Sequence, residues 1–251
     1  MIEIILFAFF AGFIMEFIDS FLGGGYGTVL TPLFLLLGFT LPEIVPMILL
    51  SEILTGILGG SFHHKFGNVD KKAVFLVTPF AIIGTLFAII AAIKVDKFLI
   101  NLYIGILVLI LGVFMLIRYW KNRNSDISTK RHNKRLPFIG GLIGFNKALS
   151  GGGFGPILVG GLSWSGYDPK KSVGSTTLTE GLVCLVGFMG YWLMNGINSI
   201  NWMLAIPLII GAISASCPAA YATHKISKKL LGIFVSTTIT ILGIAVLIKM
   251  L

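Results

Sequence analysis

The sequence predicts an all-α membrane protein built as an inverted repeat of two halves, each a re-entrant helical hairpin followed by three transmembrane helices. Three observations lead to this prediction: an apolar composition interrupted by short charged segments, a glycine-rich motif that recurs in the second half, and an uneven distribution of basic residues among the predicted loops. The mean hydropathy is +0.96 and only 12% of the residues are charged, whereas about 25% is usual in soluble proteins. This composition excludes a soluble fold.

The charged residues gather in short segments that are separated by roughly twenty apolar positions, the length of a membrane-spanning helix. The chain carries a net charge of +9, but its basic residues flank hydrophobic segments, where the positive-inside bias explains them. We therefore expect the lipid bilayer as a partner and no nucleic acid. The N-terminus lacks the basic region of a cleavable signal peptide, so the first apolar stretch is expected to remain in the mature protein.

A repeat divides the chain into two homologous halves. The motif Gly-Gly-Gly-Tyr-Gly at 23–27 recurs 128 residues later as Gly-Gly-Gly-Phe-Gly at 151–155, and the same offset aligns Ser51-Glu52 with Thr179-Glu180. Such a shared register is hard to obtain by chance. The sequence predicts a first repeat at 1–117, a basic cytoplasmic loop at 118–135 and a second repeat at 136–251.

Each half contains three segments long enough to cross a hydrocarbon core of about 30 Å. They lie at about 44–62, 73–93 and 98–117 in the first half and at about 172–193, 202–222 and 230–248 in the second. The segments beside the glycine triplets (26–38, 136–149 and 153–164) are shorter and reach only about 20 Å. They predict hairpins, at about 2–38 and 136–164, that turn inside the membrane with the glycines at the tip.

The distribution of Lys and Arg supports re-entrant hairpins. If both hairpins return to the side from which they enter, the loops 63–72, 118–135, 165–171 and 223–229 share one side and carry 15 basic residues, against 3 on the other. If each hairpin were one straight span, the split would be 11 against 7. The positive-inside rule thus places both termini outside a plasma membrane. Three spans per half then insert the two halves in opposite orientations, as in many secondary transporters.

The glycine triplets predict an anion site. Backbone that leaves a helix inside a membrane needs protein or a water-filled cavity to receive its polar groups, and the N-terminus of the helix that follows attracts anions. The alternative is that the glycines only allow close packing of helices. The candidate substrate-binding residues are Ser20, Gly23, Gly24, Gly25, Tyr26, Lys147, Ser150, Gly151, Gly152, Gly153 and Phe154.

Several ionisable residues, including Glu16 one turn before Asp19, fall inside apolar segments, where such residues are expensive and usually functional. Lys147 is expected either to attract the anion or to pair with Asp19 or a glutamate. Asp19, Glu52 and Glu180 are candidates for proton coupling or for a structural role. We find no metal cluster and no catalytic constellation, so we expect neither a metal, a cofactor nor an enzyme.

These features resemble the sulfite exporter TauE/SafE family of membrane permeases. The resemblance rests on Gly23–Gly27, Gly151–Gly155, the run Thr-Thr-Leu-Thr-Glu at 176–180 and the basic central loop, and it extends over nearly the whole chain. It implies a secondary transporter for a sulfur oxyanion or organosulfonate such as sulfite, thiosulfate or sulfoacetate, working by alternating access, and it suggests a homodimer. An anion channel and a transporter of a small carboxylate are the alternatives.

Overall fold

The computed structural model describes residues 2–120, 131–196, 200–222 and 228–250, and these residues form helices and short connections without any strand. Residues 121–130 of the predicted basic loop lie outside the described residues. The helices are α1 (Ile2–Leu22), α2 (Tyr26–Leu36), α3 (Leu41–Lys65), α4 (Lys71–Lys94), α5 (Lys97–Trp120), the 3-10 helix η1 (Asn133–Arg135), α6 (Leu136–Ser150), α7 (Phe154–Trp164), α8 (Pro169–Asn195), α9 (Trp202–Ala222) and α10 (Lys228–Met250).

The all-α membrane fold is confirmed. The described part of the chain contains 7 helices that are long and apolar enough to cross a membrane: α1, α3, α4, α5, α8, α9 and α10. Each predicted span coincides with one of them. The helix α1 is longer than the short hairpin limb that the sequence predicts. Its 21 residues reach about 32 Å, which is the length of a full span. The helices α2 and α7 are short, as the hairpins require.

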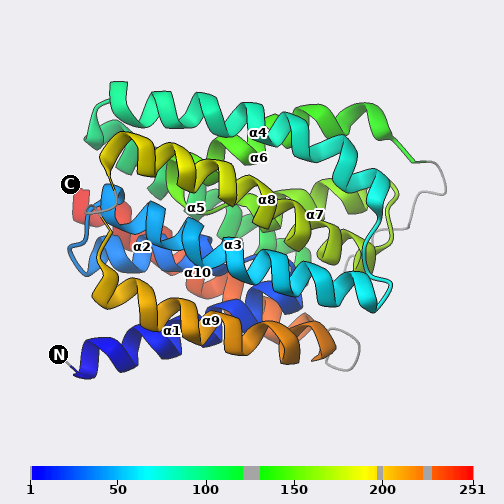
Figure 1. Ribbon diagram of the computed structural model, residues 1–251, viewed down its shortest axis with the longest axis horizontal. Helices are drawn as coiled ribbons and strands as arrows, with labels where there is room; N and C mark the ends of the chain where they lie inside the picture. The colour runs from blue at the N-terminus through cyan, green and yellow to red at the C-terminus, as the bar shows by residue number, and fades with distance from the viewer. Residues whose placement is uncertain (1, 121–130, 197–199, 223–227, 251) are drawn as a thin grey trace.

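The long helices lie side by side along the long axis of the molecule (Figure 1). The helix α1 begins and α10 ends at one end, which we call the terminal end. The connections from α3 to α4 and from α7 to α8 lie at the opposite end, which we call the basic end (Figure 1). The helices α2 and α7 begin next to each other in the interior and run toward opposite ends, α2 toward the terminal end and α7 toward the basic end.

The two halves are intertwined rather than separate. The most extensive contacts join α1 to α9, α4 to α6, α5 to α10 and α3 to α8. In the register of the repeat, α1 corresponds to α6 and α9 to α4, so the first helix of each hairpin packs on the other half. The helices α3 and α8 correspond to each other, as do α5 and α10. Neither half therefore buries its apolar surface alone.

Glycine is required at the hairpin turns. The backbone angle φ is +82° at Gly23, +72° at Gly151 and +79° at Gly153, in the left-handed region that residues with a Cβ rarely adopt. These residues end α1 and α6 and let α2 and α7 start within three residues of them. The glycine triplets that marked the hairpin tips in the sequence thus perform the reversal of the chain.

Charged side chains hold the basic end together. Asp70 caps α4 by accepting hydrogen bonds from the backbone amides of Lys72 and Ala73, at 3.1 and 3.2 Å. The guanidinium of Arg131 lies 3.2 Å from the carboxylate of Asp70 and stacks over the ring of Tyr167 at 4.7 Å. These contacts connect the segment before α6 to the start of α4 and the loop before α8.

The exterior and the interior have the inverted polarity of a membrane protein. Large apolar side chains such as Phe75, Phe87 and Ile110 are more than half exposed along α4 and α5. Several ionisable and hydroxyl side chains are instead buried in the interior, among them Glu16, Glu52 and Lys147. An apolar exterior suits contact with lipid, and intramembrane charges mark the part of the molecule where function is expected.

Candidate substrate and ion site at the hairpin tips

Five ionisable side chains converge in the interior from α1, α3, α6 and α8. Glu16, Asp19, Glu52, Lys147 and Glu180 are between 1% and 6% exposed. We call this set the charged cluster. It contains four carboxyl groups and one ammonium group, all placed beside the turns of the hairpins.

Lys147 pairs with two glutamates. Its Nζ donates a hydrogen bond to Oε1 of Glu180 at 2.7 Å and also forms an ion pair with Oε2 of Glu52. The two glutamates meet because α3 and α8 cross with their backbones in contact, where a Cβ added to Gly56 would lie 2.5 Å from the Cα of Gly181. The sequence left Asp19 and the glutamates open as partners of Lys147, and the structure shows the glutamates. These ion pairs connect α6 to both α3 and α8.

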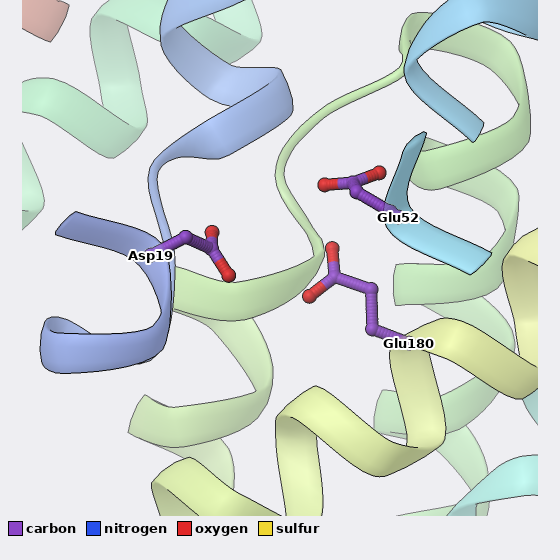
Figure 2. Close-up of side chains that lie close together, drawn as sticks. All are labelled: Asp19, Glu52 and Glu180. Atoms are coloured by element: carbon purple, nitrogen blue, oxygen red, sulfur yellow. The ribbon is translucent and has the colours of Figure 1, made fainter. Parts of the chain in front are cut away.

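Three carboxyl groups face one another in the charged cluster. Figure 2 shows Asp19, Glu52 and Glu180 pointing into one shared space from three different helices. One oxygen from each lies within 4.8 Å of the others. Oε1 of Glu52 is buried and has no hydrogen-bond partner among the described residues. Among the described residues, Lys147 forms ion pairs with Glu52 and Glu180 but none with Asp19.

The N-terminus of α2 is occupied by the protein's own carboxylate. The backbone amide of Tyr26 donates to Oδ1 of Asp19 at 2.9 Å. The hydroxyl of Ser20 donates to Oε1 of Glu16 at 2.6 Å, and the hydroxyl of Tyr26 is 2.6 Å from that of Ser51. An acidic side chain at a helix N-terminus already satisfies the positive end of the helix dipole. Ser20 and Tyr26 are therefore engaged within the protein.

The N-terminus of α7 differs from that of α2 in its hydrogen-bond partners. The amide of Gly153 donates to the hydroxyl of Thr28 at 3.0 Å, and the amide of Gly152 donates to Oγ of Ser150 at 3.2 Å. Its N-cap Gly153 has no side chain to cap the helix, and within the described part of the chain no carboxylate accepts a bond from the first amides of α7. The positive end of α7 thus faces neutral groups.

Asn146 lies beside this helix N-terminus and was missed in the sequence. A Cβ added to Gly153 would be 3.7 Å from Cβ of Asn146. Oδ1 of Asn146 accepts a hydrogen bond from the hydroxyl of Tyr103, which leaves the amide NH₂ as a donor. The alignment of the two repeats could have indicated Asn146, because it pairs this buried polar residue with the apolar Ile18. It also pairs Lys147 with Asp19.

The glycine triplets pack backbone against backbone. A Cβ at Gly27 would collide with the carbonyl oxygen of Gly151, and one at Gly152 would lie 2.8 Å from the carbonyl carbon of Gly27. A Cβ at Gly155 would collide with the Cα of Gly24. This is the close packing weighed as the alternative in the sequence, and Phe154 and Tyr26 fill buried positions next to it. A substrate role for Gly23–Gly25 and Gly151–Gly153 stays a prediction.

Two adjoining cavities open at the terminal end. A cavity of about 290 Å³ and one of about 180 Å³ share Leu41, Pro42 and Lys97 in their walls. The smaller one reaches inward to Leu149, which directly precedes the turn of the second hairpin, and to Tyr191. We call the two together the outer vestibule, after the side on which the sequence predicts the termini to lie. The larger cavity is also lined by Asn101 and Lys249, so ammonium groups stand at its mouth.

Within the described residues, seven membrane-length apolar helices and a buried charged cluster indicate a multi-pass membrane transporter. The chain belongs to the sulfite exporter TauE/SafE family, whose family model matches residues 8–246.

Relatives with assigned names support the same class. The chain is 31% identical over 255 residues to a Bacillus subtilis protein named "Probable membrane transporter protein YtnM", with 98% of this chain and 83% of that protein covered. It is 23% identical to "Probable membrane transporter protein MJ0441" of Methanocaldococcus jannaschii, with 94% and 93% covered. It is 24% identical to "Probable membrane transporter protein YdhB" of Bacillus subtilis, with 97% and 99% covered. No solved structure matches the chain.

Proposed function

We propose that this protein is a secondary transporter that moves a small anion across the plasma membrane by alternating access, with both termini outside and without catalysing a reaction. The substrate is a sulfur oxyanion or organosulfonate such as sulfite, thiosulfate or sulfoacetate. The observation that carries the proposal is the N-terminus of α7, which lies in the interior beside Asn146 and which no carboxylate of the described residues caps.

This asymmetry assigns the anion to the N-terminus of α7 alone, whereas the sequence predicts an anion site to which both glycine triplets contribute. Asp19 occupies the N-terminus of α2 as an internal anion, so a substrate would compete with a covalently attached carboxylate there. The N-terminus of α7 offers backbone amides together with the NH₂ of Asn146. Donors aimed at an anion in an apolar interior bind it strongly because charged hydrogen bonds are the strong ones.

The substrate class follows from the family and from the donors. A sulfite or sulfonate group presents three oxygens in a compact arrangement, and each can accept a hydrogen bond from an amide at the start of α7 or from Asn146. A carboxylate presents two. The ammonium groups of Lys97 and Lys249 at the outer vestibule raise the local concentration of anions before they reach the interior.

Alternating access is supported by the arrangement of the hairpins. The helices α2 and α7 start together and run to opposite ends, and each hairpin packs on a helix of the other half. If the two halves are an inverted repeat, exchanging their conformations closes the outer vestibule and opens an equivalent passage at the basic end. Such pseudo-symmetry supplies two states of similar energy.

Uptake of radiolabelled sulfite into proteoliposomes tests the proposal, with thiosulfate, sulfoacetate and acetate as competitors. We expect saturable uptake that the sulfur anions inhibit. Asn146→Leu removes one hydrogen bond to a charged group, worth about 1.5–3 kcal/mol, and should raise the half-saturation concentration by roughly 10- to 100-fold. Asn133→Leu makes the same change at the basic end, far from the site, and should leave it unchanged.

Two results would contradict the proposal. Inhibition by acetate alone would replace the sulfur anion by a carboxylate. An unchanged half-saturation concentration in Asn146→Leu would remove the anion from the N-terminus of α7.

A further inference from the structure

We infer that the carboxyl groups of Asp19, Glu52 and Glu180 bind a sodium ion, which is carried together with the anion of the proposed function. The coupling in this inference rests on that function, whereas the ion site itself does not.

The geometry of the three carboxyl groups suits a cation of this size. They come from α1, α3 and α8 and face one shared space (Figure 2), with one oxygen from each within 4.8 Å of the others. Oxygen ligands on opposite sides of an ion, at metal–oxygen distances of about 2.3–2.6 Å as for Ca²⁺, are at most about 5 Å apart. Na⁺ has a similar radius, so the three oxygens can contact one such ion at the same time.

The excess of carboxyl groups over ammonium groups in the cluster also favours a bound cation. Lys147 pairs with Glu52 and Glu180, but in the described residues no ion pair involves Asp19 or Glu16. One ammonium cannot compensate this number of carboxyl groups when they are ionised, and uncompensated charge in a membrane interior is unfavourable. Binding of a cation removes part of this excess.

Unpartnered oxygen atoms supply the second observation. Oε1 of Glu52 is buried and accepts no hydrogen bond in the described structure, although its carboxyl group points into the shared space. Oγ1 of Thr176 and Oγ1 of Thr179 are also buried without a partner, and Thr176 lies one turn before Glu180 on the same face of α8. Buried polar atoms without a partner are rare in native proteins, and a bound ion is one of the explanations for them.

A co-transported cation fits the transport of an anion. The membrane potential changes the free energy of moving net charge across the membrane. A cation that moves with the anion reduces this net charge. The proposed anion position follows Lys147 by only a few residues, and Lys147 contacts Glu52 and Glu180, so the two proposed sites are neighbours.

Binding of ²²Na⁺ to the purified protein in detergent tests the inference, at constant ionic strength maintained with choline. We expect saturable binding of about one Na⁺ per chain and a melting temperature that rises with Na⁺ but not with choline. Asp19→Asn keeps an acceptor for the amide of Tyr26 and removes the charge. It should weaken Na⁺ binding at least about tenfold, because even changes beyond the direct ligands of a metal cost that much.

Asp96→Asn is the matched control. Asp96 is exposed and caps α5 through the amide of Phe98 at 2.8 Å, so the same substitution at a helix start should leave Na⁺ binding unchanged. Absence of saturable ²²Na⁺ binding in the folded wild-type protein, or equal affinities in wild type and Asp19→Asn, would overturn the inference. Displacement of Na⁺ by lower concentrations of Ca²⁺ would overturn the assignment to a monovalent ion.

Failure of the inference is distinguishable from failure of the proposed function. Saturable sulfite uptake that proceeds equally in choline and in Na⁺ and follows an imposed pH gradient would keep the transporter, assign coupling to protons and overturn the sodium coupling. Binding of Na⁺ by a protein that takes up no sulfur anion would support the ion site and remove the substrate assignment.

Discussion

Replacing Lys147 by Met isolates the ion pairs that join α6 to α3 and α8. The ammonium of Lys147 is 1% exposed and contacts both Glu52 and Glu180, whose side chains are 4% and 6% exposed. Met has a similar length and no charge, so the variant leaves two buried carboxyl groups facing each other. Breaking a buried ion pair by removing one partner costs about 3–5 kcal/mol. Since about 1.4 kcal/mol is a factor of ten, the ratio of folded to unfolded protein should fall by at least two powers of ten.

Equilibrium unfolding in mixed detergent micelles, followed by circular dichroism in Na⁺-free buffer, measures this loss. The triple variant Lys147→Met, Glu52→Gln, Glu180→Gln removes all three charges and should recover most of the lost stability, because neutral groups of similar volume can replace a buried ion pair. Lys134→Met changes an exposed lysine of η1 and should alter the free energy of unfolding by less than about 0.5 kcal/mol. A Lys147→Met protein within about 1 kcal/mol of wild type would refute the reasoning.

Three further predictions concern packing, capping and the vestibule. Gly27→Ala should abolish folding because its Cβ would collide with the backbone of the other hairpin. Gly160→Ala places its Cβ at ordinary contact distances and should stabilise α7 by up to about 1 kcal/mol. The yield of folded protein and its unfolding curve measure both effects. Asp70→Ala removes the cap of α4 and should cost about 1 kcal/mol in the same unfolding assay. Lys97→Met should raise the half-saturation concentration for anion uptake about two- to fivefold at low salt and less at high salt, while Lys94→Met, outside both cavities, should not.

The helices were predictable because hydropathy and charge define them directly. The glycine motif located the turns, and the offset between its two copies was enough to pair Glu52 with Glu180. The length of α1 was underestimated because the hairpin interpretation rested on the shorter segments around it. The inverted orientation of the two halves in a membrane and the side of the termini stay predictions.

The partners within the site were less predictable. The sequence left Lys147 between Asp19 and the glutamates because the choice depends on where α3 and α8 cross, and that contact is made by backbone at Gly56 and Gly181. The capping of α2 by Asp19 depends on the exact path of the turn, which hydropathy does not describe. Asn146 was overlooked because a single polar residue in an apolar segment is usually a local hydrogen-bonding group.

Counterflow in proteoliposomes tests the central claim most directly. Vesicles loaded with unlabelled sulfite are diluted into a trace of labelled sulfite, and the label inside is followed over time. A carrier with one anion site and alternating access should show a transient accumulation of label above the outside concentration, and Asn146→Leu should reduce it. Label that only equilibrates, at a rate proportional to the outside concentration without saturation, would contradict the account and indicate an anion channel.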